Sequence, residues 1–268
     1  MRRTPTLLAL LLSALLAPLL VGCGQSAPSV TLNVFAAASL TGAFGELGTA
    51  FEKAHAGTHV VLNLAGSQQL AQQITQGAPA DVFASANQKQ MDIVVQSGRI
   101  ASGSSQIFVL NHLALVFPSA NPAHITSLSD LARPGLKLVL ADKSVPAGQY
   151  ALGFLDKASA DPTFGAGFKA KVLANVVSTE QDVKAVLTRV TLGGADAGIV
   201  YISDIAGSAG NQVSHIEIPA SLQVTAQYPI APLSDSKHAD LAKAFVTLVL
   251  SSQGQDTLRK YGFIPVAG

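Results

Sequence analysis

The chain has 268 residues, of which 49% are hydrophobic and 12% are charged, so it can fold around a sizeable core. This composition excludes an intrinsically disordered protein. The formal net charge of +1 at pH 7 excludes the strongly basic surface that nucleic-acid binding requires. We therefore expect an ordered protein with no nucleic-acid partner, built as one large domain or two smaller ones.

The first 22 residues have the pattern of a secretion signal. Arg2 and Arg3 form a positively charged start, and residues 7–21 form an apolar run. At roughly 15 residues, this run is short for a membrane span, which needs about 20. Residues 1–22 are therefore predicted to be a signal peptide and are excluded from the fold.

The signal ends in the sequence LVGC at residues 20–23, which is similar to a bacterial lipobox. In that motif the cysteine becomes the lipidated first residue of the mature chain, so Cys23 is predicted to carry a lipid anchor. The alternative is an ordinary cleaved signal with an incidental cysteine. Cys23 is the single cysteine, so no intramolecular disulfide can form. Residues 23–29 are predicted to be a tether, with the functional part outside the cytoplasm.

Strand and helix patterns alternate through the first third of the mature chain. Runs rich in β-formers predict strands, and apolar residues at helical spacing predict a helix after each of them. The predicted strands are residues 30–37, 58–65 and 80–86, and the helices that follow begin near residues 40, 70 and 87. This alternation favours an α/β fold with a largely parallel sheet, in which ligands bind beyond the carboxyl ends of the strands.

The middle of the chain continues the same alternation. Residues 106–118 are long for one strand, and we expect them to run between two lobes. A helix is predicted to begin near Pro146, and another behind Ser178, whose spacing to Gln181 is that of a capping box. The further predicted strands are residues 136–142, 174–178 and 197–201, and residues 226–233 are predicted to return the chain to the first lobe before a last helix over 237–251.

Four strand-to-helix junctions carry groups that can donate hydrogen bonds. Ser39 and Ser67 lie at two of them, and the turns at 146–148 and 179–183 form the other two. Helix N-termini have unpaired N–H groups and partial positive charge, so they bind anions without a lysine or arginine. Each hydroxyl taken alone is also an ordinary helix cap, and the spacing by itself names no ligand.

Five segments together resemble one known family, the periplasmic molybdate-binding proteins of ABC transporters. They occur in the family's order and span essentially the whole mature chain. The segments are VFAAASLTGAF (34–44), AGSQQLAQQITQGAPADVFASANQKQMD (65–92), PAGQYA (146–151), DVKAVLTRVTLGGADAGIVY (182–201) and YGF (261–263). The resemblance implies a two-lobed periplasmic-binding-protein fold of type II, the Venus flytrap. In that fold each lobe is a mainly parallel sheet flanked by helices, and the ligand lies in the cleft between the lobes.

The resemblance also implies which residues hold the ligand. Ser39 and Ser67 would give hydroxyl and backbone donors, Ala147 and Val183 would give backbone N–H groups, and Tyr201 would give its phenol. No catalytic residue, cofactor or direct metal-ion ligand is implied. The implied organisation is a leader at 1–22, a tether at 23–29, a first lobe of 30–112 and 226–268, and a second lobe of 113–225.

The implied function is that of an extracytoplasmic receptor that binds molybdate and tungstate and delivers them to a membrane permease. The protein would be a monomer, held at the periplasmic or outer face of the cell membrane by the lipid on Cys23. One alternative is a receptor for another tetrahedral oxyanion such as sulfate. A serine-dependent hydrolase using Ser39, Ser67 or Ser208 is a further alternative, although the sequence has no G-x-S-x-G or P-loop motif. A purely structural surface lipoprotein would leave the four junctions without a ligand.

Three other features have plainer interpretations. His55 and His59 have the spacing of a helical metal site, but Gly57 between them predicts a turn, so we expect exposed loop histidines. Asp81 is expected to orient a turn rather than to act as a catalytic acid. Gln68–Gln69 departs from the family, in which smaller hydroxyl residues follow the serine, and this puts any secondary donor there in doubt.

Overall fold

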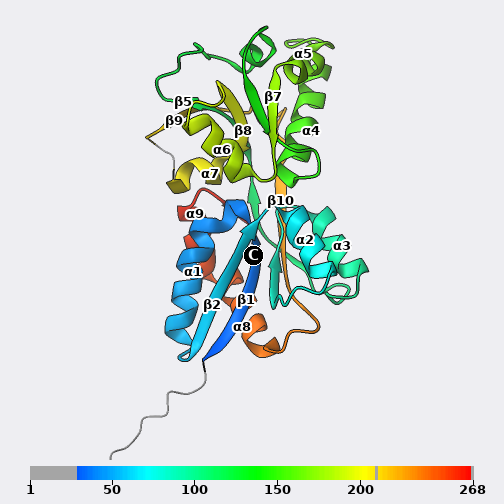
Figure 1. Ribbon diagram of the computed structural model, residues 1–268, viewed down its shortest axis with the longest axis vertical. Coiled ribbons are helices and arrows are strands. Elements are labelled where there is room, and N and C mark those ends of the chain that lie inside the picture. Colours follow the sequence, from blue (N-terminus) through cyan, green and yellow to red (C-terminus); the bar gives the residue numbers. More distant parts are fainter. Residues whose placement is uncertain (1–28, 209–210, 267–268) are drawn as a thin grey trace, which may run out of the picture.

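The computed structural model describes residues 29–208 and 211–266 of the chain, so the predicted leader and Cys23 lie outside the described residues. The described chain forms two sheets, each flanked by helices, which are stacked as two lobes (Figure 1). This confirms the predicted two-lobed α/β fold. Within the described ranges, no helix combines the length and the apolar character that crossing a bilayer requires.

The first sheet has the strand order β11-β4-β10-β3-β1-β2. β1 pairs in parallel with both β2 and β3, whereas β10 pairs antiparallel with β3 and β4, and β11 pairs antiparallel with β4. The sheet is therefore mixed and not mainly parallel as predicted, because the chain returns through β10 and then forms β11, and its parallel half carries the first strand-to-helix junctions. Its strands are β1 (Val30–Ala37), β2 (Thr58–Ala65), β3 (Val82–Ala84), β4 (Gln106–Asn111), β10 (Ala226–Pro232) and β11 (Ile264–Pro265).

In the described part of the chain, six helices flank this sheet, and aromatic rings fill the space beneath α1. The Phe245 ring lies 5.8 Å from that of Phe44 and 5.4 Å from that of Phe51, and all three residues are fully buried. Burial of these apolar rings stabilises the first lobe, which holds its share of the cleft residues in position. The helices are η1 (Ala38–Leu40), α1 (Thr41–Ala54), α2 (Ser67–Thr75), α3 (Gln88–Gln96), α8 (Ala239–Leu250) and α9 (Ser252–Lys260).

The second sheet has the strand order β7-β6-β8-β5-β9. β6 pairs in parallel with β7 and β8, and β5 pairs antiparallel with β8 and β9. Its strands are β5 (Leu113–Pro118), β6 (Leu138–Ala141), β7 (Val176–Glu180), β8 (Ala197–Tyr201) and β9 (Val213–Glu217). The helices are η2 (Leu128–Ala132), α4 (Pro146–Ala160), α5 (Phe168–Ala174), α6 (Val183–Thr191) and α7 (Ile202–Ser208).

The predicted long strand at 106–118 passes between the lobes as two strands. β4 belongs to the first sheet and β5 to the second, and the strand pattern is interrupted at His112, whose N–H donates to Asn111 Oδ1 at 3.0 Å. β10 then returns the chain to the first sheet (Figure 1). The first sheet therefore takes strands from both ends of the described chain, and the second sheet from its middle.

Two further predictions of local structure are wrong. Ser178 lies inside β7 and donates to Glu180 Oε1 at 2.8 Å instead of capping a helix, because pairing with β6 extends the strand through Glu180. The N-cap of α6 is Asp182. The predicted last helix at 237–251 is in fact α8 followed by α9, because Ser251 has extended backbone and its side chain caps α9 by accepting from Gly254 N–H.

Candidate functional site

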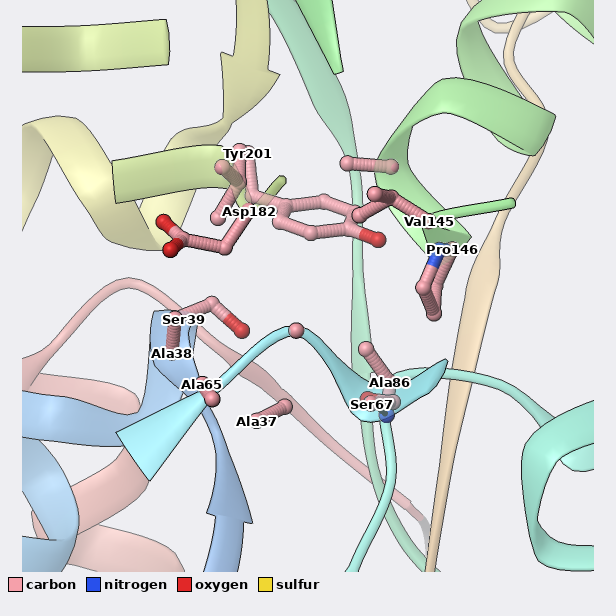
Figure 2. A pocket seen from close by; sticks show the side chains of 13 residues that line it. Ala37, Ala38, Ser39, Ala65, Ser67, Ala86, Val145, Pro146, Asp182 and Tyr201 are labelled. Atoms are coloured by element: carbon pink, nitrogen blue, oxygen red, sulfur yellow. Dashed lines mark hydrogen bonds between the residues drawn. The ribbon is translucent and has the colours of Figure 1, made fainter. Parts of the chain in front are cut away.

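A small cavity lies between the two lobes, at the point where strands of both sheets run into helices. All five residues that the resemblance implies as ligand-binding line it: Ser39, Ser67, Ala147, Val183 and Tyr201. Figure 2 shows Ser39 and Ser67 on one side of the cavity and Tyr201 on the other. The closed lobes leave only about 10 Å³ in which the centre of a water molecule fits, so the closed cavity has room for a small ion but not for a sugar or a peptide.

Three of the four helix starts at the cavity leave their N–H groups without a side-chain cap. These are the starts of η1, α2 and α4. Pro146 is the first residue of α4 and has no N–H, so the Ala147 N–H is the first donor of that helix. Because the first N–H groups of a helix have no acceptor within it, these donors are available to a ligand.

The fourth helix start, that of α6, keeps a donor free although it is capped. The Asp182 carboxylate accepts from Ala185 N–H at 2.9 Å. This bond uses the third N–H of the helix and leaves the first, that of Val183, without an acceptor in the helix. Asp182 was not among the predicted site residues. An aspartate directly before an apolar helical stripe is an ordinary capping signal that could have indicated it.

The Tyr201 hydroxyl is a buried donor that lacks a partner. The residue is 1% exposed, and its hydroxyl has no hydrogen-bond partner among the described residues. In Figure 2 the phenol extends from the end of β8 into the space between the lobes. Burial raises the pKa of Tyr201 well above its usual range, so the hydroxyl keeps its proton. An unpaired buried hydroxyl is unfavourable, which indicates that an acceptor belongs in this space.

Each of the two serine hydroxyls already forms one hydrogen bond within the first lobe. Ser67 Oγ accepts from Ala86 N–H at 3.0 Å, so its own proton is free to be donated. Ser39 Oγ lies 2.9 Å from the hydroxyl of Tyr228. Both serines are buried, at 1% and 4% exposure. Ser67 therefore presents a donor to the cavity, and both hydroxyls are shielded from bulk water.

The cavity is lined without a positive side chain. Of the described residues that line it, none is lysine or arginine, and the one charged residue is Asp182. In Figure 2 the Asp182 carboxylate points away from the Tyr201 hydroxyl, in keeping with its bond to the start of α6. The cavity therefore offers neutral donors from hydroxyls and helix N-termini, which is the chemistry of an anion site that recognises an unprotonated ligand.

An ion pair with a buried carboxylate, between Lys184 and Asp204, positions the backbone of Tyr201. Asp204 is 0% exposed, and its Oδ2 accepts from Tyr201 N–H at 3.1 Å while its Oδ1 lies 3.1 Å from Lys184 Nζ. Burial raises the pKa of Asp204, and the Lys184 ammonium opposes that shift. This pair fixes the end of β8, and with it the direction of the phenol.

Side chains beside the cavity link the two lobes directly. Gln68 Nε2 donates to the backbone oxygen of Gln181 at 2.8 Å, and Gln69 Nε2 donates to Gln181 Oε1 at 2.7 Å. Asn87 Nδ2 also donates to Gln149 Oε1 at 3.1 Å. The lobes are therefore closed on each other. Gln68 and Gln69, which in the sequence are only departures from the family, both form hydrogen bonds across the cleft.

The remaining candidates lie away from the cavity. The His55 ring stacks on Phe51 with centroids 3.9 Å apart, and His59 Nδ1 lies 2.7 Å from Glu52 Oε1. Asp81 accepts from Asn33 N–H at 2.7 Å and from Ser236 Oγ at 2.6 Å, so it ties β1 to the segment before α8. In the described residues, no three His, Cys, Asp or Glu side chains gather as a metal ion would require. The Ser208 side chain lies outside the described part.

Comparison with known proteins identifies the family. The family model of the bacterial extracellular solute-binding proteins matches residues 32–264. The molybdate-binding protein ModA of Mycobacterium tuberculosis is 38% identical over 263 residues, which cover 94% of this chain and 95% of that protein. The chain belongs to the bacterial extracellular solute-binding proteins. Because proteins of this family bind solutes for transporters and are not enzymes, the hydrolase hypothesis is set aside, and what the protein binds is a transported ligand rather than a cofactor.

Solved structures of other solute-binding proteins share the fold. The periplasmic molybdate-binding protein of Azotobacter vinelandii matches with a TM-score of 0.76 at 22% identity, covering 88% of this chain and all of that one. The sulfate-binding protein SubI of Mycobacterium tuberculosis matches with a TM-score of 0.78 at 20% identity, covering 88% of this chain and 87% of that one. At these identities the likeness establishes the two-lobed architecture of the solute-binding protein.

Proposed function

We propose that this solute-binding protein is the molybdate and tungstate receptor of an ABC importer. The observation that carries the proposal is the small cavity between the lobes, which is lined by neutral donors and includes the unpartnered Tyr201 hydroxyl. In the proposed complex Ser39 and Ser67 donate from the first lobe, and Ala147, Val183 and Tyr201 donate from the second. The name and the 38% identity of the Mycobacterium tuberculosis relative support molybdate as the ligand.

The chemistry of the donors supports an anion that carries no proton. Molybdate at neutral pH is a fully deprotonated tetrahedral dianion, so each of its oxygens accepts hydrogen bonds. Hydrogenphosphate has a proton that needs an acceptor, and burying that proton unpaired costs about 1–3 kcal/mol. The carboxylate of Asp182 caps α6 by accepting from Ala185 N–H, and it points away from the Tyr201 hydroxyl (Figure 2). Bonds to a charged acceptor are stronger than neutral ones, so several neutral donors replace a lysine or arginine.

Sulfate is the second candidate ligand. It is also a tetrahedral dianion without a proton, and the structural likeness to a sulfate-binding protein favours it as the alternative. Sulfate is smaller than molybdate, so the two anions differ in how many of the donors they reach at once. Tungstate has nearly the size and charge of molybdate and is expected to bind alongside it.

The shift in melting temperature distinguishes these ligands from one another. Molybdate and tungstate are expected to raise the melting temperature of the mature protein by about 5–10 °C at a concentration of 100 times Kd, because the ligand binds only the folded state. Sulfate and phosphate at the same concentration are expected to raise it by less than about 1 °C. Differential scanning calorimetry with each anion in turn is the measurement. Equal shifts for all four anions would contradict the selectivity and indicate a general oxyanion receptor.

The proposed place of the protein is the outer face of the cell membrane, where it delivers the anion to a permease as a monomer. The LVGC motif supports a lipid on Cys23. Cys23→Ser is expected to move the protein from the membrane fraction to the soluble fraction while leaving its molybdate affinity unchanged. Cell fractionation and mass spectrometry of the mature N-terminus test this. A wild-type protein that is already soluble and does not begin at Cys23 would refute the anchor.

A further inference from the structure

Four buried polar side chains form a hydrogen-bonded chain beneath the cavity. Ser39 Oγ lies 2.9 Å from Tyr228 Oη. Asn111 Nδ2 lies 3.4 Å from the same Tyr228 oxygen and 2.8 Å from Ser203 Oγ. The four residues are between 0% and 4% exposed. The chain joins η1 in the first lobe to the crossing strands β4 and β10 and to α7 in the second lobe, and Tyr228 itself does not line the cavity.

The direction of the donors in this chain follows from Asn111. Its Oδ1 accepts from His112 N–H at 3.0 Å, and a backbone N–H can only donate. The amide nitrogen of Asn111, which also only donates, therefore faces Ser203 and Tyr228. Tyr228 Oη accepts from Asn111, and the other hydrogen-bond partner of this hydroxyl among the described residues is Ser39 Oγ, so we assign the single proton of Tyr228 to Ser39 Oγ.

We propose that Tyr228 is a positioning residue that directs the Ser39 proton into the cavity. A serine hydroxyl has one proton and two lone pairs, and here one lone pair receives the proton of Tyr228. The Ser39 proton is then left for an acceptor in the cavity. Without this bond, the Ser39 hydroxyl rotates among other acceptors and must be ordered when the anion binds. This inference rests on the proposed function, because it assigns Tyr228 to the same anion site.

The Tyr228 ring is held independently of its hydroxyl, so the two roles can be separated. Its centroid lies 5.5 Å from that of Phe263, 5.9 Å from that of Tyr201 and 6.3 Å from that of Phe108, all in edge-to-face contacts. Burial raises the pKa of Tyr228 well above its usual range, so the hydroxyl remains a donor. Tyr228→Phe therefore keeps the packing and removes the bond to Ser39.

The test is a double-mutant cycle, with molybdate titrated calorimetrically into the mature protein. Tyr228→Phe is expected to raise Kd about three- to tenfold, the effect of one ordinary hydrogen bond. The Tyr228→Phe and Ser39→Ala double variant is expected to bind no more weakly than Ser39→Ala alone, because Tyr228 acts through the Ser39 hydroxyl. A residue with a merely structural role would give losses that add.

Two further variants complete the experiment. Tyr261→Phe is the matched control, because its hydroxyl donates to Glu46 Oε2 at 3.1 Å outside the cavity, and its Kd is expected to equal that of wild type. Asn111→Asp replaces the donor by an acceptor that competes with Ser39 for the proton of Tyr228, and it is expected to weaken binding although the phenol is retained. Circular dichroism establishes that each variant is folded.

The outcomes separate this inference from the proposed function. A wild-type Kd in Tyr228→Phe, or losses that add in the double variant, would overturn the positioning role while leaving the anion site intact. A wild-type protein that binds none of molybdate, tungstate and sulfate would overturn the proposed function, and this inference with it.

Discussion

The Tyr201→Phe variant is expected to bind molybdate about ten- to 150-fold more weakly than wild type, the effect of losing one hydrogen bond to a charged acceptor. The phenylalanine ring keeps the contacts with the rings of Tyr150 and Tyr228, so the fold should not change. The unliganded variant is expected to melt at the wild-type temperature or slightly above it, because the hydroxyl that is removed has no partner among the described residues. Isothermal titration calorimetry and thermal unfolding of the same samples measure both effects.

Ser39→Ala provides the corresponding test on the opposite lobe. Because the proposed anion contacts both lobes, it makes more bonds in the closed state than in the open one, and this difference drives closure. Ser39→Ala is therefore expected to weaken binding by an amount similar to that of Tyr201→Phe. Unchanged affinity in both variants would mean that Ser39 lies at an ordinary helix start and that the anion binds elsewhere.

The Gly66→Ala variant is expected to bind molybdate about five- to 150-fold more weakly, because the added methyl group holds the lobes apart. A Cβ at position 66 would lie 2.5 Å from the backbone oxygen of Gln181, which belongs to the other lobe. The backbone of Gly66 has φ −58° and ψ 135°, which alanine adopts without strain. The first lobe should therefore fold normally, and the effect should be confined to the closed state.

Gly45→Ala is the matched control for this variant. It lies in α1 of the same lobe, and a Cβ there would meet no atom within 4 Å. Its affinity is expected to match that of wild type, with a melting temperature that is unchanged or higher. Small-angle scattering should show the molybdate-induced compaction in Gly45→Ala and a smaller compaction in Gly66→Ala. Full compaction and wild-type affinity in Gly66→Ala would contradict the close approach of the lobes at Gln181.

The elements that the sequence predicts best are those with strong local patterns. β1 and β2 occupy the predicted residues 30–37 and 58–65, because apolar β-formers alternate there between clear turn signals. Errors arise where a long-range contact decides the boundary. β7 begins at Val176 rather than at residue 174, because α5 extends through Ala174 and the amide of Asn175 donates to Leu131 O and Arg133 O at 2.8 Å each.

The sequence alone therefore determined the positions of the donors, because helix starts and hydroxyls are local features of the chain. Tertiary structure decided which of them meet. Ser39 and Tyr228 are 189 residues apart, and Gln69 and Gln181 are 112 residues apart, yet each pair is hydrogen-bonded. Hydroxyl and amide groups form such bonds with any suitable partner, so their spacing in the chain contains no signal of the pairing. The stacking of the two lobes around the crossing strands selects the partners, and it leaves the Tyr201 hydroxyl unpaired among the described residues, at the place where an anion is expected to bind.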